Sequence, residues 1–104
     1  MARFDVYPNP AASERRHTPY LLDVQNNYLD LIETTVVVPL CSADAMPLRA
    51  RDLNPALSVK GRQVILNTAE IGAIPTRLLR APVAHLGPSQ ADIQTALDTL
   101  FGGH

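Results

Sequence analysis

The chain has 104 residues, of which 46% are hydrophobic and 18% are charged. These values predict a single globular domain over residues 1–104 and exclude a disordered or fibrous chain. The formal net charge is -1, and no block of basic residues occurs, which argues against a protein that binds nucleic acid mainly through phosphates. Eight of the nine basic residues are arginine. Because arginine makes forked contacts to carboxylates, a protein partner is at least as well supported.

The N-terminal residues MARFDVYP lack the charged and then apolar pattern of a signal peptide. No apolar run approaches the ~18 residues of a membrane-spanning helix, so we expect a soluble cytoplasmic protein. Cys41 is the only cysteine, which excludes a disulfide within the chain. Its place after the apolar run VVVPL predicts a small buried side chain, and a catalytic thiolate would need a base partner that the sequence does not show.

The first third of the chain predicts a long hairpin. Apolar Phe4 and Val6 alternate along the chain with Arg3, Asp5 and Tyr7, which is the period of a half-buried strand. A polar loop over 8–19 follows, and the apolar segment YLLDV at 20–24 is expected to pair back on the first strand. The next segment, QNNYLDLIE at 25–33, is ambiguous between a turn with exposed apolar residues and a short helical turn.

TTVVVPL, at 34–40, is the clearest strand, because it is β-branched, continuous and too short for a helix. Pro39 cannot donate a backbone hydrogen bond, so we expect it at an edge strand or a bulge. A connection over 42–55 leads to ALSVKGRQVILNT at 56–68, which predicts a hairpin that turns at Lys60-Gly61, with Gly61 supplying a positive φ.

Two less regular segments follow the second hairpin. AEIGAIP, at 69–75, is expected to be a loop. TRLLRAPVAHL, at 76–86, is expected to hold one or two short strands that Pro82 interrupts.

The hydrophobic period changes after Pro88. Ser89 followed three residues later by Asp92 is a helix-start signature. One apolar stripe of a helix contains Ile93, Leu97, Leu100 and Phe101, and Ala96 lies beside it. Gly102 occupies the position of a left-handed helix cap. The sequence therefore predicts five or six antiparallel strands and one C-terminal helix, a mostly β fold of the α+β class.

Signals of catalysis are weak. His17, His85 and His104 are not spaced as metal ligands, and we expect His17 to be solvated in a loop and His85 to be half-buried at a strand end. The glycines form no phosphate-binding loop, so we expect no cofactor. Acid–base chemistry could be assembled from Glu70, Arg77 and His85 only if the fold brought them together.

Two features suggest an interaction surface. Tyr28 and Leu29 interrupt the polar stretch DVQNNYLD, either as a core-facing turn or as an exposed apolar contact. The C-terminal helix is expected to pack on the sheet, but its last turn could project beyond it.

Several segments together resemble the CcdB toxins of plasmid and chromosomal toxin–antitoxin modules. The resemblance covers the whole length in order, through FDVY, YLLDVQNNYLD, VVVPL, NPALSVKGRQVILNTAEIGAIP and ADIQTALDTLFGG. It implies a small antiparallel, barrel-like sheet with a C-terminal helix, of the same class as some ribonuclease toxins, and a homodimer.

The resemblance also implies a mechanism without catalysis. Such a toxin binds the dimerisation domain of the gyrase A subunit, traps the DNA-cleavage state and produces double-strand breaks. A cognate antitoxin of the CcdA type wraps the toxin with a disordered C-terminal segment, displaces gyrase and helps to repress the shared operon, so contact with DNA is only indirect.

Carried over position by position, the gyrase-contact residues of the family fall in the turn and the tail: Tyr28, Leu29, Asp98, Phe101, Gly102, Gly103 and His104. The family has a tryptophan at the position of Gly102, an asparagine at that of Asp98 and an aliphatic residue at that of His104. Truncating a buried tryptophan at an interface commonly weakens the binding free energy by about 2 kcal/mol or more.

Three interpretations of these departures stay open. The chain could bind gyrase through a shifted contact that uses Phe101 and Tyr28, it could act on another target, or it could bind an antitoxin and do little else. An endoribonuclease toxin on the related fold is a further alternative, with Arg77, His85 and Thr68 as its candidate groups, but the pI of about 6.2 argues against an RNA-binding surface.

Overall fold

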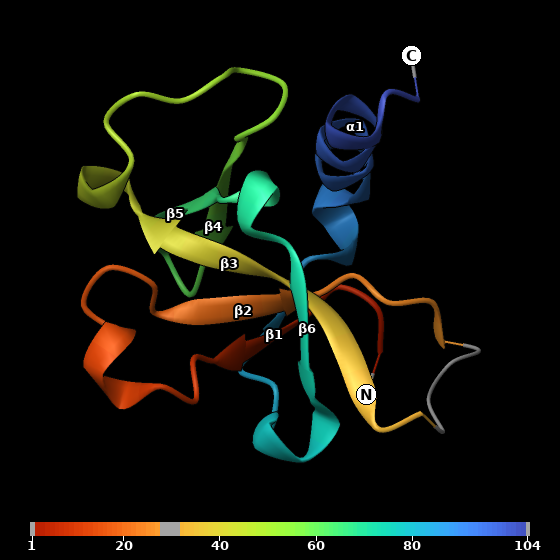
Figure 1. Ribbon diagram of the computed structural model, residues 1–104. Helices are drawn as coiled ribbons and strands as arrows, with labels where there is room; N and C mark the ends of the chain where they lie inside the picture. The colour runs from red at the N-terminus through yellow and green to blue at the C-terminus, as the bar shows by residue number, and fades with distance from the viewer. Residues whose placement is uncertain (1, 28–31, 104) are drawn as a thin grey trace.

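The computed structural model describes residues 2–27 and 32–103 (Figure 1). Tyr28, Leu29 and His104 therefore lie outside the described residues. In the described part, seven strands precede one C-terminal helix, with short 3-10 turns between them. The elements are β1 (Asp5–Pro8), β2 (Tyr20–Asp23), β3 (Thr34–Ser42), β4 (Ala56–Val59), β5 (Arg62–Leu66), β6 (Gly72–Pro75), β7 (Ala84–His85) and α1 (Gln90–Phe101). This architecture confirms the predicted mostly β fold with a terminal helix.

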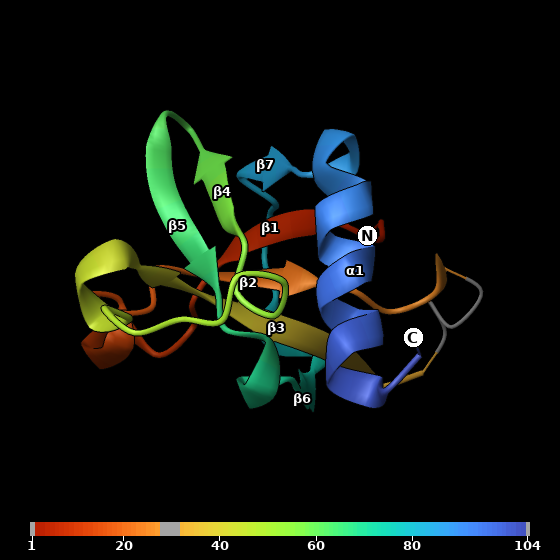
Figure 2. The same cartoon turned by 90° about the horizontal axis from the view of Figure 1, so that it is seen from above.

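All the strand pairs in the described residues are antiparallel, in the order β4-β5-β3-β2-β1-β7, with β6 paired to β3 outside that path. The predicted hairpin is confirmed, because Val6 pairs with Leu22 across β1 and β2. The β4–β5 hairpin curls over the same side of the sheet as α1 (Figure 2). The result is a nearly closed, barrel-like sheet, because twisted strands bend round to bury one common face.

The main core lies between α1 and that inner face. Side chains from the central strands, including Val6, Leu22 and Val38, pack in one cluster with Ile93 and Leu97 of α1. Val6, Leu22, Val38 and Ile93 are fully buried. Because this cluster joins the helix to β1, β2, β3, β4 and β5, it fixes the position of the helix on the sheet.

The outer face of the sheet carries a second, smaller core, which corrects the expected alternation of β1. Tyr7 was predicted to lie on the polar face, but it is fully buried with Leu21, Val37 and Leu79. The reason is tertiary, since Leu79, just after the 3-10 turn Thr76–Leu78, is placed over this face.

The β4–β5 hairpin turns at Lys60-Gly61 as predicted. Lys60 has a φ of 53° and Gly61 a φ of 79°. Two consecutive positive φ values are typical of a type I′ turn, whose twist matches that of the flanking strands.

Pro39 and β6 correct two expectations. Pro39 was expected at an edge strand or a bulge, but β3 is a central strand, so the edge position is wrong. On one side of β3, β6 pairs with residues 34–37 and β5 pairs with residues 40–42. Pro39 falls between these two partners, where no strand pairs with it, so its missing N–H costs no hydrogen bond of the sheet on that side. Residues 72–75, expected as a loop, supply β6. Its sequence GAIP has little strand character, and its pairing with distant β3 defines it.

The sequence predicted the helix closely. Ser89 is the N-cap residue of α1, but its side chain makes no capping hydrogen bond, and a 3-10 turn over Gly87–Ser89 leads into the helix instead. On the predicted stripe, Ile93, Ala96 and Leu97 are buried.

We predict that Ile93→Ala lowers the free energy of unfolding by about 3 kcal/mol, because it opens a cavity between α1 and the sheet. Leu48→Ala is the matched control, since Leu48 is 92% exposed. Urea unfolding followed by circular dichroism measures both. A loss smaller than ~1 kcal/mol for Ile93→Ala would contradict the role given to this contact.

Candidate functional site

The last turn of α1 projects an aromatic side chain into solvent. Phe101 is 69% exposed, whereas Leu97, one turn earlier, is buried. Leu100 is half-buried, so it marks where the helix leaves the sheet. An exposed aromatic at the end of a packed helix is accessible to a partner, and aromatic side chains are enriched at protein interfaces.

The two glycines end the helix with a defined cap. Gly102 has a φ of 72° in the left-handed region, and its N–H donates to the carbonyl of Asp98. The N–H of Gly103 donates to the same carbonyl at 2.8 Å. This is the predicted glycine cap, and it holds the tail against the helix end.

Space at Gly102 is open, since a Cβ built there would have no atom within 4 Å. Its positive φ is nevertheless one that side chains rarely adopt. A side chain at 102 is therefore sterically possible but strained by about 1 kcal/mol while the cap persists.

A network of hydrogen bonds connects the last turns of α1 to the N-terminal residues. The Asp98 carboxylate accepts from Gln94 Nε2 at 3.0 Å, and Gln94 Oε1 accepts from Arg3 Nη2 at 3.2 Å. Arg3 is held in turn by the Val24 carbonyl, which accepts from its Nε at 3.1 Å. The guanidinium lies 4.6 Å from the centre of the Phe4 ring, a distance suited to a cation–π contact.

The same network reaches the turn after β2. The backbone N–H of Arg3 donates to Asn27 Oδ1 at 2.7 Å. Asn27 thus connects through Arg3 and Gln94 to Asp98 at the tail. Ile32, before β3, is 46% exposed.

The fold gathers the described candidate residues at one end of α1. It places Asp98, Phe101, Gly102 and Gly103 at the end of α1 and links that end to residue 27. The assignments of Tyr28, Leu29 and His104 stay predictions.

Sequence reasoning missed Arg3, Asn27 and Gln94. Arg3 and Gln94 are 91 positions apart, and no local pattern signals such a contact. Gln94 and Asp98 are separated by one helical turn, and that spacing alone could have suggested their hydrogen bond.

The alternative catalytic groups do not converge. The Thr68 side chain is fully buried and donates to the carbonyl of Leu53. His85 lies on β7 with its Nδ1 3.0 Å from Asp5 Oδ1, and its exposed side chain corrects the expected half-buried position. Arg77 lines two hollows, neither of which includes Thr68 or His85. The ribonuclease arrangement is therefore not assembled.

Glu70 and Arg77, from the candidate acid–base set, line different hollows, so the fold does not bring them into one site. Over residues 2–27 and 32–103, no three His, Cys, Asp or Glu side chains are grouped so that they could hold a metal ion. In the same ranges, no helix is both long and apolar enough to cross a membrane. Cys41 is buried, as predicted.

Comparison with protein families matches the model described as "CcdB protein" over residues 3–103. The match covers nearly the whole chain, and the fold agrees with it. The chain therefore belongs to the CcdB family, the toxins of toxin–antitoxin modules that act on gyrase.

We predict that Arg3→Met lowers the free energy of unfolding by about 1–2 kcal/mol, because it leaves the Val24 carbonyl and Gln94 without their charged donor. Arg49→Met, at an exposed position, should change stability by less than ~0.5 kcal/mol. Chemical denaturation compares the two variants. Equal stabilities would show that the network contributes nothing.

Proposed function

We propose that this protein is a homodimeric, non-enzymatic toxin that binds the gyrase A subunit and traps the gyrase–DNA cleavage complex. The observation that carries the proposal is Phe101, a 69% exposed aromatic at the rigid end of α1 in a chain of the CcdB family. The mechanism is a population shift, since a ligand that binds only the open, cleaved state of gyrase accumulates that state.

The proposed contact surface includes the tail, with Phe101 as its main apolar anchor. Asp98 belongs to this surface, and its carboxylate already accepts a hydrogen bond from Gln94. An engaged carboxylate is a weaker replacement for a neutral amide that contacts a partner directly. Tyr28 and Leu29 are proposed as the second anchor.

Gly102 is the departure that most affects the proposal. It supplies no side chain where the family has tryptophan, so Phe101 must provide more of the binding energy than in relatives. A protein that binds only an antitoxin is the second candidate function, favoured by this missing side chain. Growth arrest on expression of the chain alone would contradict that second candidate.

The proposed partners also include an antitoxin. A disordered segment of that protein would fold on the toxin surface, displace gyrase and support repression of the shared operon. Dimerisation suits a chain of 104 residues, because symmetric pairing adds buried area to a small core.

We predict that Phe101→Ala weakens binding to the purified gyrase A dimerisation domain by about 30-fold, because a central aromatic anchor contributes about 2 kcal/mol. Its folding stability should stay nearly unchanged, since the side chain is mostly exposed. Leu48→Ala removes another exposed apolar side chain and should leave affinity unchanged. Calorimetric titration gives the affinities, and equal weakening by both variants would contradict the assignment.

A second prediction concerns the missing aromatic. Gly102→Trp should tighten gyrase binding, because it adds an interface anchor in open space. Gly102→Ala is the matched control, since it carries the same strain at a φ of 72° without the aromatic ring. If Gly102→Trp binds no better than Gly102→Ala, position 102 does not face the target.

A further inference from the structure

A basic hollow lies where the loop after β1 meets the turn after β6. It measures about 540 Å³, which is within the ~300–1,000 Å³ of typical small-molecule sites. The described residues that line it are Pro8, Pro10, Arg15, Arg77, Leu78 and Arg80. None of the described tail residues lines it, so a ligand bound here would define a site separate from the proposed gyrase contact.

Three arginines line this hollow without a neutralising carboxylate. Among its described lining residues there is no Asp or Glu. Over residues 2–27 and 32–103, none of the three guanidinium groups has a salt-bridge partner within 4.0 Å. Like charges gathered around one hollow repel one another, and a bound anion relieves that repulsion. The hollow therefore favours a ligand that carries several negative charges.

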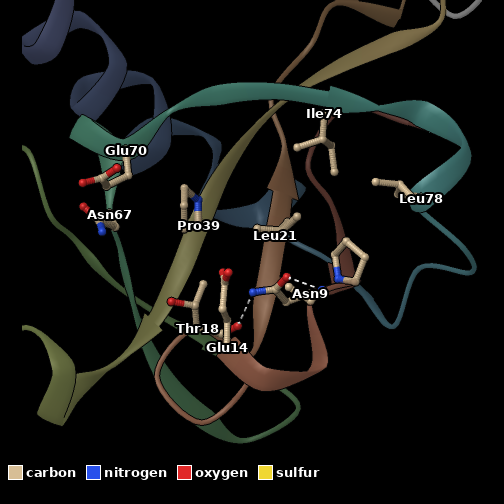
Figure 3. A pocket seen from close by; sticks show the side chains of 11 residues that line it. Asn9, Glu14, Thr18, Leu21, Pro39, Asn67, Glu70, Ile74 and Leu78 are labelled. Carbon is tan, nitrogen blue, oxygen red and sulfur yellow. Dashed lines mark hydrogen bonds between the residues drawn. The ribbon is translucent and has the colours of Figure 1, made fainter.

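Arg15 is oriented before any ligand binds. Its Nε donates to the Asn9 carbonyl at 2.6 Å, which directs the guanidinium and leaves both Nη groups available. Asn9 is itself buried, and its Nδ2 donates to the Thr18 carbonyl at 2.9 Å. Its Oδ1 accepts from the N–H of Ala11, also at 2.9 Å (Figure 3). An oriented side chain loses less conformational entropy on binding, which favours a site that exists in advance.

The other two arginines lie on a turn that the fold anchors. The N–H of Thr76, where the turn begins, donates to the Glu33 carbonyl at 2.8 Å. Leu79 is buried in the outer core of the sheet, and it lies between Arg77 and Arg80 in the sequence. Both arginines are exposed. The anchored turn thus presents two guanidinium groups to solvent beside the hollow.

The adjoining hollow limits how far an anion can extend. It measures about 640 Å³ and shares Pro10 and Leu78 with the basic hollow. Glu14 and Glu70 line it, and no described basic residue does (Figure 3). An extended anion that left the basic hollow in this direction would be repelled by these carboxylates. The two linings together favour a compact anion.

We propose that the hollow formed by Arg15, Arg77 and Arg80 binds a compact oligophosphate, either inorganic or as the phosphate chain of a nucleoside triphosphate. Guanidinium groups bind phosphate oxygens in forked pairs. A chain of three phosphates offers each arginine an anionic group, whereas a single phosphate does not. The inference depends on neither gyrase nor a protein partner.

The test compares four probes: tripolyphosphate, ATP, inorganic phosphate and citrate. Each is titrated into the ¹⁵N-labelled full chain without divalent cations and at one ionic strength, because salt screens exposed charges. Backbone amide shifts report affinity and position. The proposal predicts saturable shifts in residues 9–17 and 76–80, with tripolyphosphate binding at least about tenfold tighter than phosphate or citrate. Tighter binding of ATP than of tripolyphosphate identifies the nucleotide as the source, and equal or weaker binding identifies the inorganic chain.

Neutral variants then test the arginines. Arg77→Gln/Arg80→Gln should weaken tripolyphosphate binding about tenfold, because two charged donors are lost. Arg49→Gln/Arg51→Gln, in the exposed loop before β4, is matched in total charge and should have little effect. Arg15→Lys keeps the charge but loses the planar fork, and it should weaken binding about threefold.

Absence of saturable shifts, or equal loss of affinity in the two double variants, would overturn the proposal. Phosphate or citrate binding as tight as that of tripolyphosphate would also overturn it, as would shifts that lie mainly outside residues 9–17 and 76–80. The amide spectrum of each variant without a probe confirms that the fold is retained.

Discussion

The burial of Ile93, Ala96 and Leu97 against the sheet determines where the chain presents its C-terminal tail. Because the β4–β5 hairpin and the central strands share one core with these side chains, the helix cannot tilt without opening that core. The exposed Phe101 and the capped glycines therefore occupy a fixed position in space. A rigid anchor loses little conformational entropy on binding, which favours its use as a recognition element.

The Arg3 network gives the tail a second attachment. It ties the start of the chain, the turn after β2 and the last turns of α1 into one polar assembly through Asn27, Gln94 and Asp98. Such an assembly aligns two segments that are distant in sequence without covering Phe101. Glycine at position 102, where the resemblance implies an aromatic, leaves the helix end ordered, because the left-handed Gly102 closes the helix.

Local signals predicted the parts of the fold that depend on local physics. The Lys60-Gly61 turn and the α1 stripe follow from backbone freedom and helical period, and both are present. β6 was missed because its pairing with distant β3 defines it, and the burial of Tyr7 was missed because it depends on distant Leu79. At the site, the sequence placed Phe101 on the apolar stripe and left open whether the last turn projects, and the structure shows that Phe101 is exposed. The contact between Arg3 and Gln94 joins residues 91 positions apart and leaves no sequence pattern.

The central claim, that this chain poisons gyrase, is tested most directly by cleavage-complex formation. Purified unmodified protein is incubated with gyrase, supercoiled plasmid and ATP, and the products are separated after denaturation and proteolysis. The account predicts linear plasmid that accumulates with toxin concentration and is lost with Phe101→Ala. No linear plasmid at concentrations that saturate binding to the gyrase A subunit would contradict it, because binding would then occur without trapping the cleaved state.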